Sequence, residues 1–339
     1  SLYDEIDNCS DKNNRNWRKD STFDDLYHRN DEMVAVCEVS QDTLTNSLET
    51  GKNWSEFFIS ANLFDVFDSC LTQYHPHIAK VIRGERTGWN PMFVIPANKM
   101  KVSGIDSKYL IPYLKSPSEL ENIAFHNKFN YYVLVCSDDM NHLYDGTKKW
   151  ILKFKDAPNK NHSATIEQAN KGHKPYWYSI SPKRAHIITA INPYNRFFFT
   201  YSENAFAIDQ RLIALQVQPG YDVELVAALL NSAVTFLTLE MWGTSRNLGA
   251  LDLNANYLKQ LRVLNPDMLD DKNIAIIKEA FEPLKNREVG AIADEVKRKD
   301  RRAFDSAILK AYGLDANILD DIYRLLSDSV KNRVEMSTR

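Results

Sequence analysis

Glycine and cysteine are scarce in this sequence of 339 residues, and each scarcity excludes several classes of site. No two of its 11 glycines lie two positions apart, so the Gly-x-Gly loop of a Rossmann cofactor site is absent. The phosphate-binding loop G-x-x-x-x-G-K-[ST] is absent as well. The cysteines are far apart and form no CxxC pair, which argues against a zinc site and against a disulfide framework. We therefore expect no metal and a reducing, cytoplasmic compartment. The cysteines are Cys9, Cys37, Cys70 and Cys136.

A long, unbroken apolar run is also missing. The first twenty residues are polar and do not look like a secretory signal. The longest apolar stretch, LVAALLNSAVTFLTLEMW, is interrupted by Asn231, Ser232 and Glu240. It therefore predicts one buried helix over residues 223–243 rather than a membrane span.

The net charge of −3 hides an uneven distribution of charge along the chain. Residues 1–50 hold twelve acidic and five basic residues, a balance of −7. Residues 83–200 hold seventeen basic and nine acidic residues, a balance of +8. A basic middle in a mildly acidic chain is typical of a surface that binds a polyanion. The alternative is that these lysines are scattered, solvated charges, and counting does not separate the two.

Apolar periodicity predicts an α+β fold, with a twisted, mixed or antiparallel sheet-rich domain, packed helices and a C-terminal helical extension. Residues 1–50 are a polar lead with one strand at 33–40, residues 51–266 form the main domain, and residues 267–339 form the extension. Apolar spacing predicts a helix at 53–74, and Gly313 marks a helix end. Strands are expected at 77–82, 92–96, 130–139, 176–192, 196–209 and 212–219; WILKFK at 150–155 also alternates.

The segment RGERTGWNPMFVIP, residues 83–96, combines two arginines, two glycines and a tryptophan before an apolar run. Glycine permits backbone geometry that other residues avoid, and arginine offers a planar fork of donors that suits phosphates and guanine edges. The flanking residues predict a strand, a loop and a strand, with the chemistry at the loop. The alternative is a long surface hairpin in which Trp89 only covers the core.

Four segments in the same order resemble the target-recognition region of N-6 adenine-specific DNA methyltransferases of the TaqI type and of fused type IIG restriction–modification enzymes. The family pattern I-x-x-G-x-x-T-G-x-N-x-x-F is matched, with altered spacing at the front, by Ile82, Gly84, Thr87, Gly88, Asn90 and Phe93. The segments at 174–182, 228–266 and 301–315 are similar to later parts of the same region. The resemblance covers about residues 53 to 335.

The resemblance implies that the chain reads a sequence in double-stranded DNA beside an upstream methyltransferase domain. The family's cofactor loop and its Pro-Pro catalytic motif are not in this chain, and INPYNRFFF (191–199) holds only one proline. We therefore assign no catalytic residue, no metal and no cofactor here, and expect S-adenosylmethionine to bind the missing domain. The polar lead is then a remnant of that domain or a linker to it.

The residues expected at the DNA fall into three kinds. Arg83, Arg86 and Asn90 are of the types that bind base edges, with Thr87 and Gly88 giving close backbone approach. Trp177 is of a type that stacks on a base, although alternation in YWYSIS favours a core role for it or for Tyr178. The remaining candidates are Trp89 on the loop and, for phosphate contacts, Lys148, Lys149, Lys183, Arg184, Arg196 and Arg246.

Two other interpretations stay open at this point. The chain could be a docking module whose C-terminal helices bind a partner subunit, as in specificity subunits. It could also be an independent enzyme such as a nuclease, although no clustered acidic site supports this. The basic run KRKDRR (297–302) is expected to be a solvated helix face.

Overall fold

The structure, a computed structural model, describes residues 69–336 apart from 85, 126–128, 191 and 246–248. Before residue 69 it describes positions 41, 42 and 45 and three short strands that form an antiparallel sheet. These strands are β1 (Arg18–Lys19), β2 (Tyr27–Asn30) and β3 (Ala35–Glu38). Strand β3 confirms the strand predicted for residues 33–40.

The helix predicted for residues 53–74 lies mostly outside the described residues, and its end is wrong. Leu71–Gln73 form strand β4, which pairs antiparallel with β14 (Arg262–Leu264). Strand β14 lies about 190 positions further along the chain, so the local sequence around β4 does not predict this pairing. Long-range pairing has here overridden a helical periodicity, as tertiary context often does.

A seven-stranded mixed sheet forms the middle of the molecule and confirms the predicted α+β fold. Its strand order is β5-β11-β9-β10-β7-β8-β6, and the β10–β7 pair is parallel while the other pairs are antiparallel. The strands are β5 (Ala79–Arg83), β6 (Val94–Pro96), β7 (Leu110–Leu114), β8 (Tyr131–Leu134), β9 (Arg184–Thr189), β10 (Phe199–Ile208) and β11 (Ile213–Val217).

The two strands that flank the loop at 84–93 do not form a hairpin. Strand β5 pairs with β11 and strand β6 pairs with β8, so they lie at opposite edges of the sheet. Residues 84–93 therefore carry the chain from one edge of the sheet to the other. The prediction of a strand, a loop and a strand is confirmed, and the interpretation as a paired hairpin is wrong.

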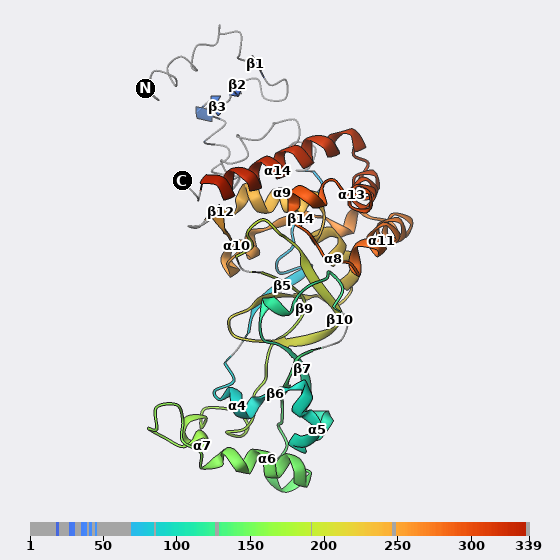
Figure 1. The fold of residues 1–339 in the computed structure, drawn as a ribbon. Coiled ribbons are helices and arrows are strands. Elements are labelled where there is room, and N and C mark those ends of the chain that lie inside the picture. The colour runs from blue at the N-terminus through green and yellow to red at the C-terminus, as the bar shows by residue number, and fades with distance from the viewer. Residues whose placement is uncertain are drawn as a thin grey trace, which may run out of the picture.

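Beyond β7, short helices and strands β6 and β8 enclose a second hydrophobic cluster, which we call the distal lobe (Figure 1). WILKFK, whose alternation is typical of a strand, belongs to a helix there. Thr147 and Ile151 are buried one turn apart on that helix, and the Trp150 indole donates to the Met92 carbonyl at 2.9 Å. The helices are α4 (Asn90–Phe93), α5 (Met100–Ser103), α6 (Asp145–Lys155) and α7 (Ile166–Ala169), with 3-10 turns at Ala97–Lys99, Ser107–Tyr109, Pro117–Glu119 and Met140–His142.

At the other end of the sheet, helices pack into the helical body, which we define as residues 223–336 (Figure 1). Helices before and after residue 266 contribute to one hydrophobic cluster, which includes Phe236, Phe281 and Phe304. The elements are α8 (Val223–Leu230), α9 (Ala233–Trp242), β12 (Thr244–Ser245), β13 (Leu251–Asp252), α10 (Ala255–Gln260), α11 (Asp271–Lys285), α12 (Ile292–Glu295), α13 (Lys299–Ala311) and α14 (Leu319–Met336), with 3-10 turns at Pro266–Met268 and Ala316–Ile318.

The single helix predicted over residues 223–243 is in fact two helices, α8 and α9, bent by 59°. Asn231 at the break is fully buried. Its side-chain Nδ2 donates to the Phe199 carbonyl at 2.8 Å, and its Oδ1 accepts from the Phe199 backbone N–H at 3.0 Å. Ser232 then caps α9 by accepting from the Thr235 amide. In the described part of the chain no single helix is long and apolar enough to span a membrane; this bent pair passes that test only jointly, and its residues are largely buried.

The expectation of a solvated face at residues 297–302 is confirmed for four of its five basic residues and is wrong at Arg301 of α13. Arg301 is only 2% exposed and lies between Glu295 and Asp305, at 3.6 and 3.8 Å. Its Nη1 also donates to the Asn231 carbonyl at 2.6 Å. Arg301 is therefore a buried structural residue although it belongs to a basic run, whereas its neighbour Arg302 is exposed.

Candidate nucleic-acid interface

A groove with a volume of about 670 Å³, which we call the larger groove, lies over β5, β11 and the start of β9. Among the described residues that line it there are five basic side chains and no Asp or Glu. All five are exposed. A groove of one charge sign concentrates an electrostatic field on a ligand of the opposite sign. The basic residues are Lys80, Arg83, Lys183, Arg184 and Lys259.

Three separate elements bring these cations together. Lys80 points outward from β5, where it lies opposite Gln216 of β11, which also lines the larger groove. Strand β9 begins at Arg184 beside β11, and helix α10 adds Lys259. Burial lowers the pKa of nearby His75, and the positive charges of Lys259 and Lys80 lower it further. The groove is therefore a region of positive potential.

A second, smaller groove of about 310 Å³ continues from the first, because Ser181 and Pro182 line both. Exposed Arg86 and Lys174 supply its positive charge. Burial lowers the pKa of His173 on its wall, partly opposed by a hydrogen bond to the Trp177 backbone. A lowered pKa keeps the imidazole neutral near pH 7. Polar lining also comes from Thr87, Tyr113 and Ser179.

The turn between β10 and β11 connects the two arginines of the loop. Arg83 Nε donates to the backbone carbonyl of Gln210 at 3.1 Å. Arg86 Nε donates to the side-chain Oε1 of the same Gln210 at 2.7 Å. Arg83 lines the larger groove and Arg86 lines the smaller one. One residue therefore holds one arginine in each groove.

Asp209 fixes this turn from inside the protein. Its carboxylate is 3% exposed and accepts from the Tyr113 hydroxyl at 2.9 Å and from Arg211 Nε at 2.8 Å. Burial raises the pKa of Asp209, but the bonds from Arg211 and Tyr113 outweigh burial and hold the pKa below its usual value. A Cβ on Gly84 would overlap the Asp209 backbone carbonyl, so the start of the loop lies directly against the turn.

Thr87 and Gly88, in the middle of the loop, both contact other parts of the protein. Gly88 has a φ of +79°, and a Cβ there would overlap Oδ1 of Asn170. Thr87 is buried, and its hydroxyl donates to Oδ1 of exposed Asn90 at 2.5 Å. The close backbone approach expected at Gly88 is made in this structure to Asn170. Asn90 lies at the start of α4 and lines neither groove.

Both tryptophans of interest pack on the distal lobe. Trp89 is half-buried just before α4, and Trp177 is half-buried with its ring edge-on to Tyr178 at 5.6 Å between centroids. Tyr178 is 2% exposed, as the alternation in YWYSIS predicts for at least one of the pair. Stacking of Trp177 on a base and contact of Trp89 with DNA stay predictions.

Four further candidates lie away from the two grooves or outside the described residues. Lys148 and Lys149 lie on α6 of the distal lobe and line neither groove. Arg246 falls outside the described residues. Arg196 lines a third cavity of about 540 Å³.

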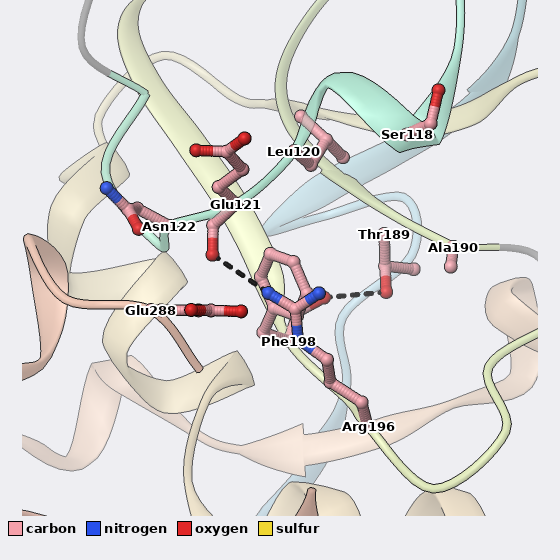
Figure 2. A pocket seen from close by; sticks show the side chains of 9 residues that line it. All are labelled: Ser118, Leu120, Glu121, Asn122, Thr189, Ala190, Arg196, Phe198 and Glu288. Carbon is pink, nitrogen blue, oxygen red and sulfur yellow. Dashed lines mark hydrogen bonds between the residues drawn. The ribbon is translucent and has the colours of Figure 1, made fainter. Parts of the chain in front are cut away.

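Figure 2 shows how Arg196 is held in that cavity. Its Nη2 donates to the Glu121 carbonyl at 3.0 Å, and its guanidinium lies 4.7 Å from the Phe198 ring centroid. Outside the view, its Nε donates to the Val289 carbonyl at 2.6 Å. Glu121 and Glu288 also line the cavity. The mixed charge distinguishes this cavity from the larger groove. Arg196 joins the segment that precedes β10 to the helical body through Val289.

The structure also adds residues that the sequence did not single out. Lys80 could have been found, because it alternates with the buried residues of β5. Lys174 sits in a loop among other polar residues and carries no distinguishing signal. Lys259 lines the larger groove, and Gln210 binds the two groove arginines, only because of the fold: they lie about 180 and 125 residues away from the strand and the loop that they contact.

The sequence matches no protein-family model and no curated protein. Among solved structures, the fold is similar to that of the type IIG restriction endonuclease BpuSI, with a TM-score of 0.62 and 15% identity over 90% of this chain. The match covers 36% of that chain, so the present chain spans about a third of the length of the enzyme. At this identity the match shows a shared fold. The sequence resemblance is thus confirmed as a structural likeness to a region of a type IIG enzyme.

Proposed function

We propose that this chain is a DNA target-recognition module, which binds duplex DNA along the two grooves and selects a short sequence within it. The observation that carries the proposal is the larger groove, where five exposed cations meet without an acidic residue among its described lining. Neutralising backbone phosphates releases counterions and supplies most of the salt-dependent affinity for DNA. Such contacts position a protein on the duplex, while neighbouring contacts to base edges select sequence.

The smaller groove offers side chains for the second requirement of such a module, which is contact with base edges. Arg86 lies in the smaller groove next to polar lining residues. The smaller groove is continuous with the larger one through Ser181 and Pro182. A duplex held by its phosphates in the larger groove would bring base edges to this position. The likeness to part of a type IIG restriction endonuclease supports the same assignment.

The larger protein that we propose is a restriction–modification adenine methyltransferase. This chain has no Gly-x-Gly cofactor loop and no Pro-Pro catalytic motif, so we assign S-adenosylmethionine and the transfer step to the other domains. Whether the parent also cleaves DNA is a property of those domains.

The test is selection from a pool of randomised duplex DNA at moderate salt, followed by salt titration of the selected duplex. We expect an enriched motif in the wild type. For the variant Lys80→Ala/Lys183→Ala/Arg184→Ala we expect a plot of log affinity against log salt that is less steep by about 0.9 per phosphate contact removed. The matched control Lys299→Ala/Lys310→Ala/Arg324→Ala removes the same charge from exposed positions of the helical body and should keep the wild-type slope.

Either of two results would contradict the proposal. If the wild type does not retain DNA, the grooves are not a DNA site, and a partner-docking role for the helical body gains support. If DNA is retained without enrichment of a motif, the chain grips phosphate but does not select sequence.

A further inference from the structure

Resting on the proposed function, we propose that Gln210 is the positioning residue of the sequence-reading site. It holds Arg86 so that the arginine binds the major-groove edge of a guanine. The recognised duplex then contains a guanine whose selection depends on Gln210 as well as on Arg86.

The hydrogen-bond geometry is the first reason. Gln210 Oε1 accepts from Arg86 Nε at 2.7 Å, so the bond uses the inner nitrogen of the guanidinium. Arg86 is exposed, and its side chain lines the smaller groove. A guanidinium held by Nε still offers its terminal Nη1 and Nη2 groups as a fork. That fork matches guanine O6 and N7, the commonest specific contact of arginine with DNA.

The rigidity of the turn is the second reason. Gln210 follows Asp209, whose buried carboxylate is bound by Tyr113 and Arg211. The Asp209 amide also donates to the Leu114 carbonyl at 3.0 Å. Gly84, whose amide donates to the Leu212 carbonyl at 3.2 Å, presses the loop against this turn. A recognition group selects bases well only when neighbouring contacts fix its position.

The neutrality of glutamine is the third reason. A carboxylate at position 210 would pair with Arg86 and weaken its interaction with the negatively charged duplex. The amide oxygen orients the guanidinium and leaves its charge in place. Gln210 also holds Arg83 in the larger groove, but through its backbone carbonyl at 3.1 Å. Of the two arginines, the side chain therefore holds Arg86 and the backbone holds Arg83, and this separation makes the proposal testable.

The experiment applies the same duplex selection to the full chain in four forms: wild type, Gln210→Ala, Arg86→Ala and the double variant. We expect the wild type to enrich a motif with one strongly selected guanine. Arg86→Ala should relax the preference at that position by roughly 5- to 150-fold. Gln210→Ala should relax the same position to a smaller extent, and it should add nothing in the Arg86→Ala background.

Two readouts separate positioning from a general structural effect. The slope of log affinity against log salt should stay at the wild-type value in Gln210→Ala, because no phosphate contact is lost. In an Arg83→Ala background, Gln210→Ala should still relax the guanine position in full, because the Arg83 bond goes to the backbone.

The results that overturn the proposal differ from those that overturn the proposed function. If the wild type enriches no motif, the proposed function fails and this inference fails with it. If the wild type enriches a motif and Gln210→Ala enriches the same motif equally, only the role of Gln210 is wrong. The positioning role is also wrong if Gln210→Ala keeps its effect in the Arg86→Ala background. If the relaxed position is not a guanine, the assigned base is wrong.

Discussion

Two buried arginines of the helical body and two arginines of the grooves are the same residue type in opposite settings. Arg301 and Arg333 are 2% and 7% exposed, and each is held by carboxylates. Arg333 Nη2 lies 2.6 Å from Oε1 of Glu240, a bond that joins α14 to α9. Arg83 and Arg86 are exposed, and their hydrogen bonds to described residues go to the carbonyl and the amide oxygen of Gln210.

This difference has a direct physical cause and a functional consequence. A cation taken out of water requires a nearby anion, because the cost of desolvating an unpaired charge is large. An exposed arginine oriented by neutral oxygen atoms keeps its charge for an external partner. The partners of a basic residue, rather than its presence in a basic run, therefore distinguish the two roles. KRKDRR, the densest basic run, contributes Arg301 to the core, whereas the dispersed Lys80, Lys183 and Lys259 form the groove.

The largest effect that would break this comparison is expected at Arg301. Arg301→Ala removes the buried cation between Glu295 and Asp305. Glu295 keeps its ion pair with Arg287 at 2.7 Å, whereas Asp305 loses its guanidinium, and burial already raises the pKa of Asp305. We expect the free energy of unfolding to fall by about 3–5 kcal/mol, measured by denaturant titration. The control Arg302→Ala removes an exposed arginine from the same helix and should cost less than about 1 kcal/mol. Equal effects at both positions would show that burial does not separate the two kinds of arginine.

An intermediate effect is expected at Asp209, a buried carboxylate next to the grooves. Asp209→Asn replaces the charge that binds Arg211 and Tyr113, and should lower the free energy of unfolding by about 1–3 kcal/mol at neutral pH.

The pH dependence of this variant follows from the lowered pKa of Asp209. A carboxyl whose folded pKa lies below its unfolded value of about 4 contributes its full stability above that pH. The contribution is lost as pH falls through the folded pKa. The difference between wild type and Asp209→Asn, measured by thermal denaturation, should therefore be largest near pH 7 and shrink below about pH 4. A difference that stays constant down to pH 2 would contradict an ionised Asp209.

The smallest effect is expected at Lys259, the groove cation that the helical body supplies through α10. Lys259→Ala should lower the slope of log affinity for duplex DNA against log salt by about 1, since one phosphate contact is removed. Its thermal stability should match that of the wild type, because the side chain is exposed. Lys310→Ala, on the helical body but outside the groove, is the control and should leave the slope unchanged. An unchanged slope in Lys259→Ala would restrict the DNA site to the sheet.

Local patterns in the sequence predicted most strands of the sheet and the helices at the C-terminal end, but not β7 (Leu110–Leu114). Strands β8, β10 and β11 and the helix end at Gly313 lie where alternation and the glycine place them, whereas β9 occupies only Arg184–Thr189 of the strand predicted at 176–192. Besides the end of the helix expected at 53–74, which is strand β4, two further local predictions were wrong. The alternation at 150–155 lies in a helix that packs on the distal lobe, and the predicted helix at 223–243 breaks where Asn231 binds β10.

The candidate site was predicted in part. Arg83, Arg86, Lys183 and Arg184 carry residue types suited to DNA, and the structure places all four along the two continuous grooves. Lys148, Lys149 and Arg196 carry the same signal and lie elsewhere. The residue type shows that a side chain is able to bind DNA. Its position in the fold decides whether the side chain lies in a groove where DNA would bind.

The sequence by itself determined most of the strands, the C-terminal helices and the composition of the loop at 83–96. The tertiary structure alone decided that β5 and β6 lie at opposite edges of the sheet and that Lys259 joins the larger groove. It also decided that Gln210 lies between Arg83 and Arg86. The physical reason is that periodicity reports which face of an element is buried, whereas the partner that covers it is chosen by packing between residues far apart in the chain.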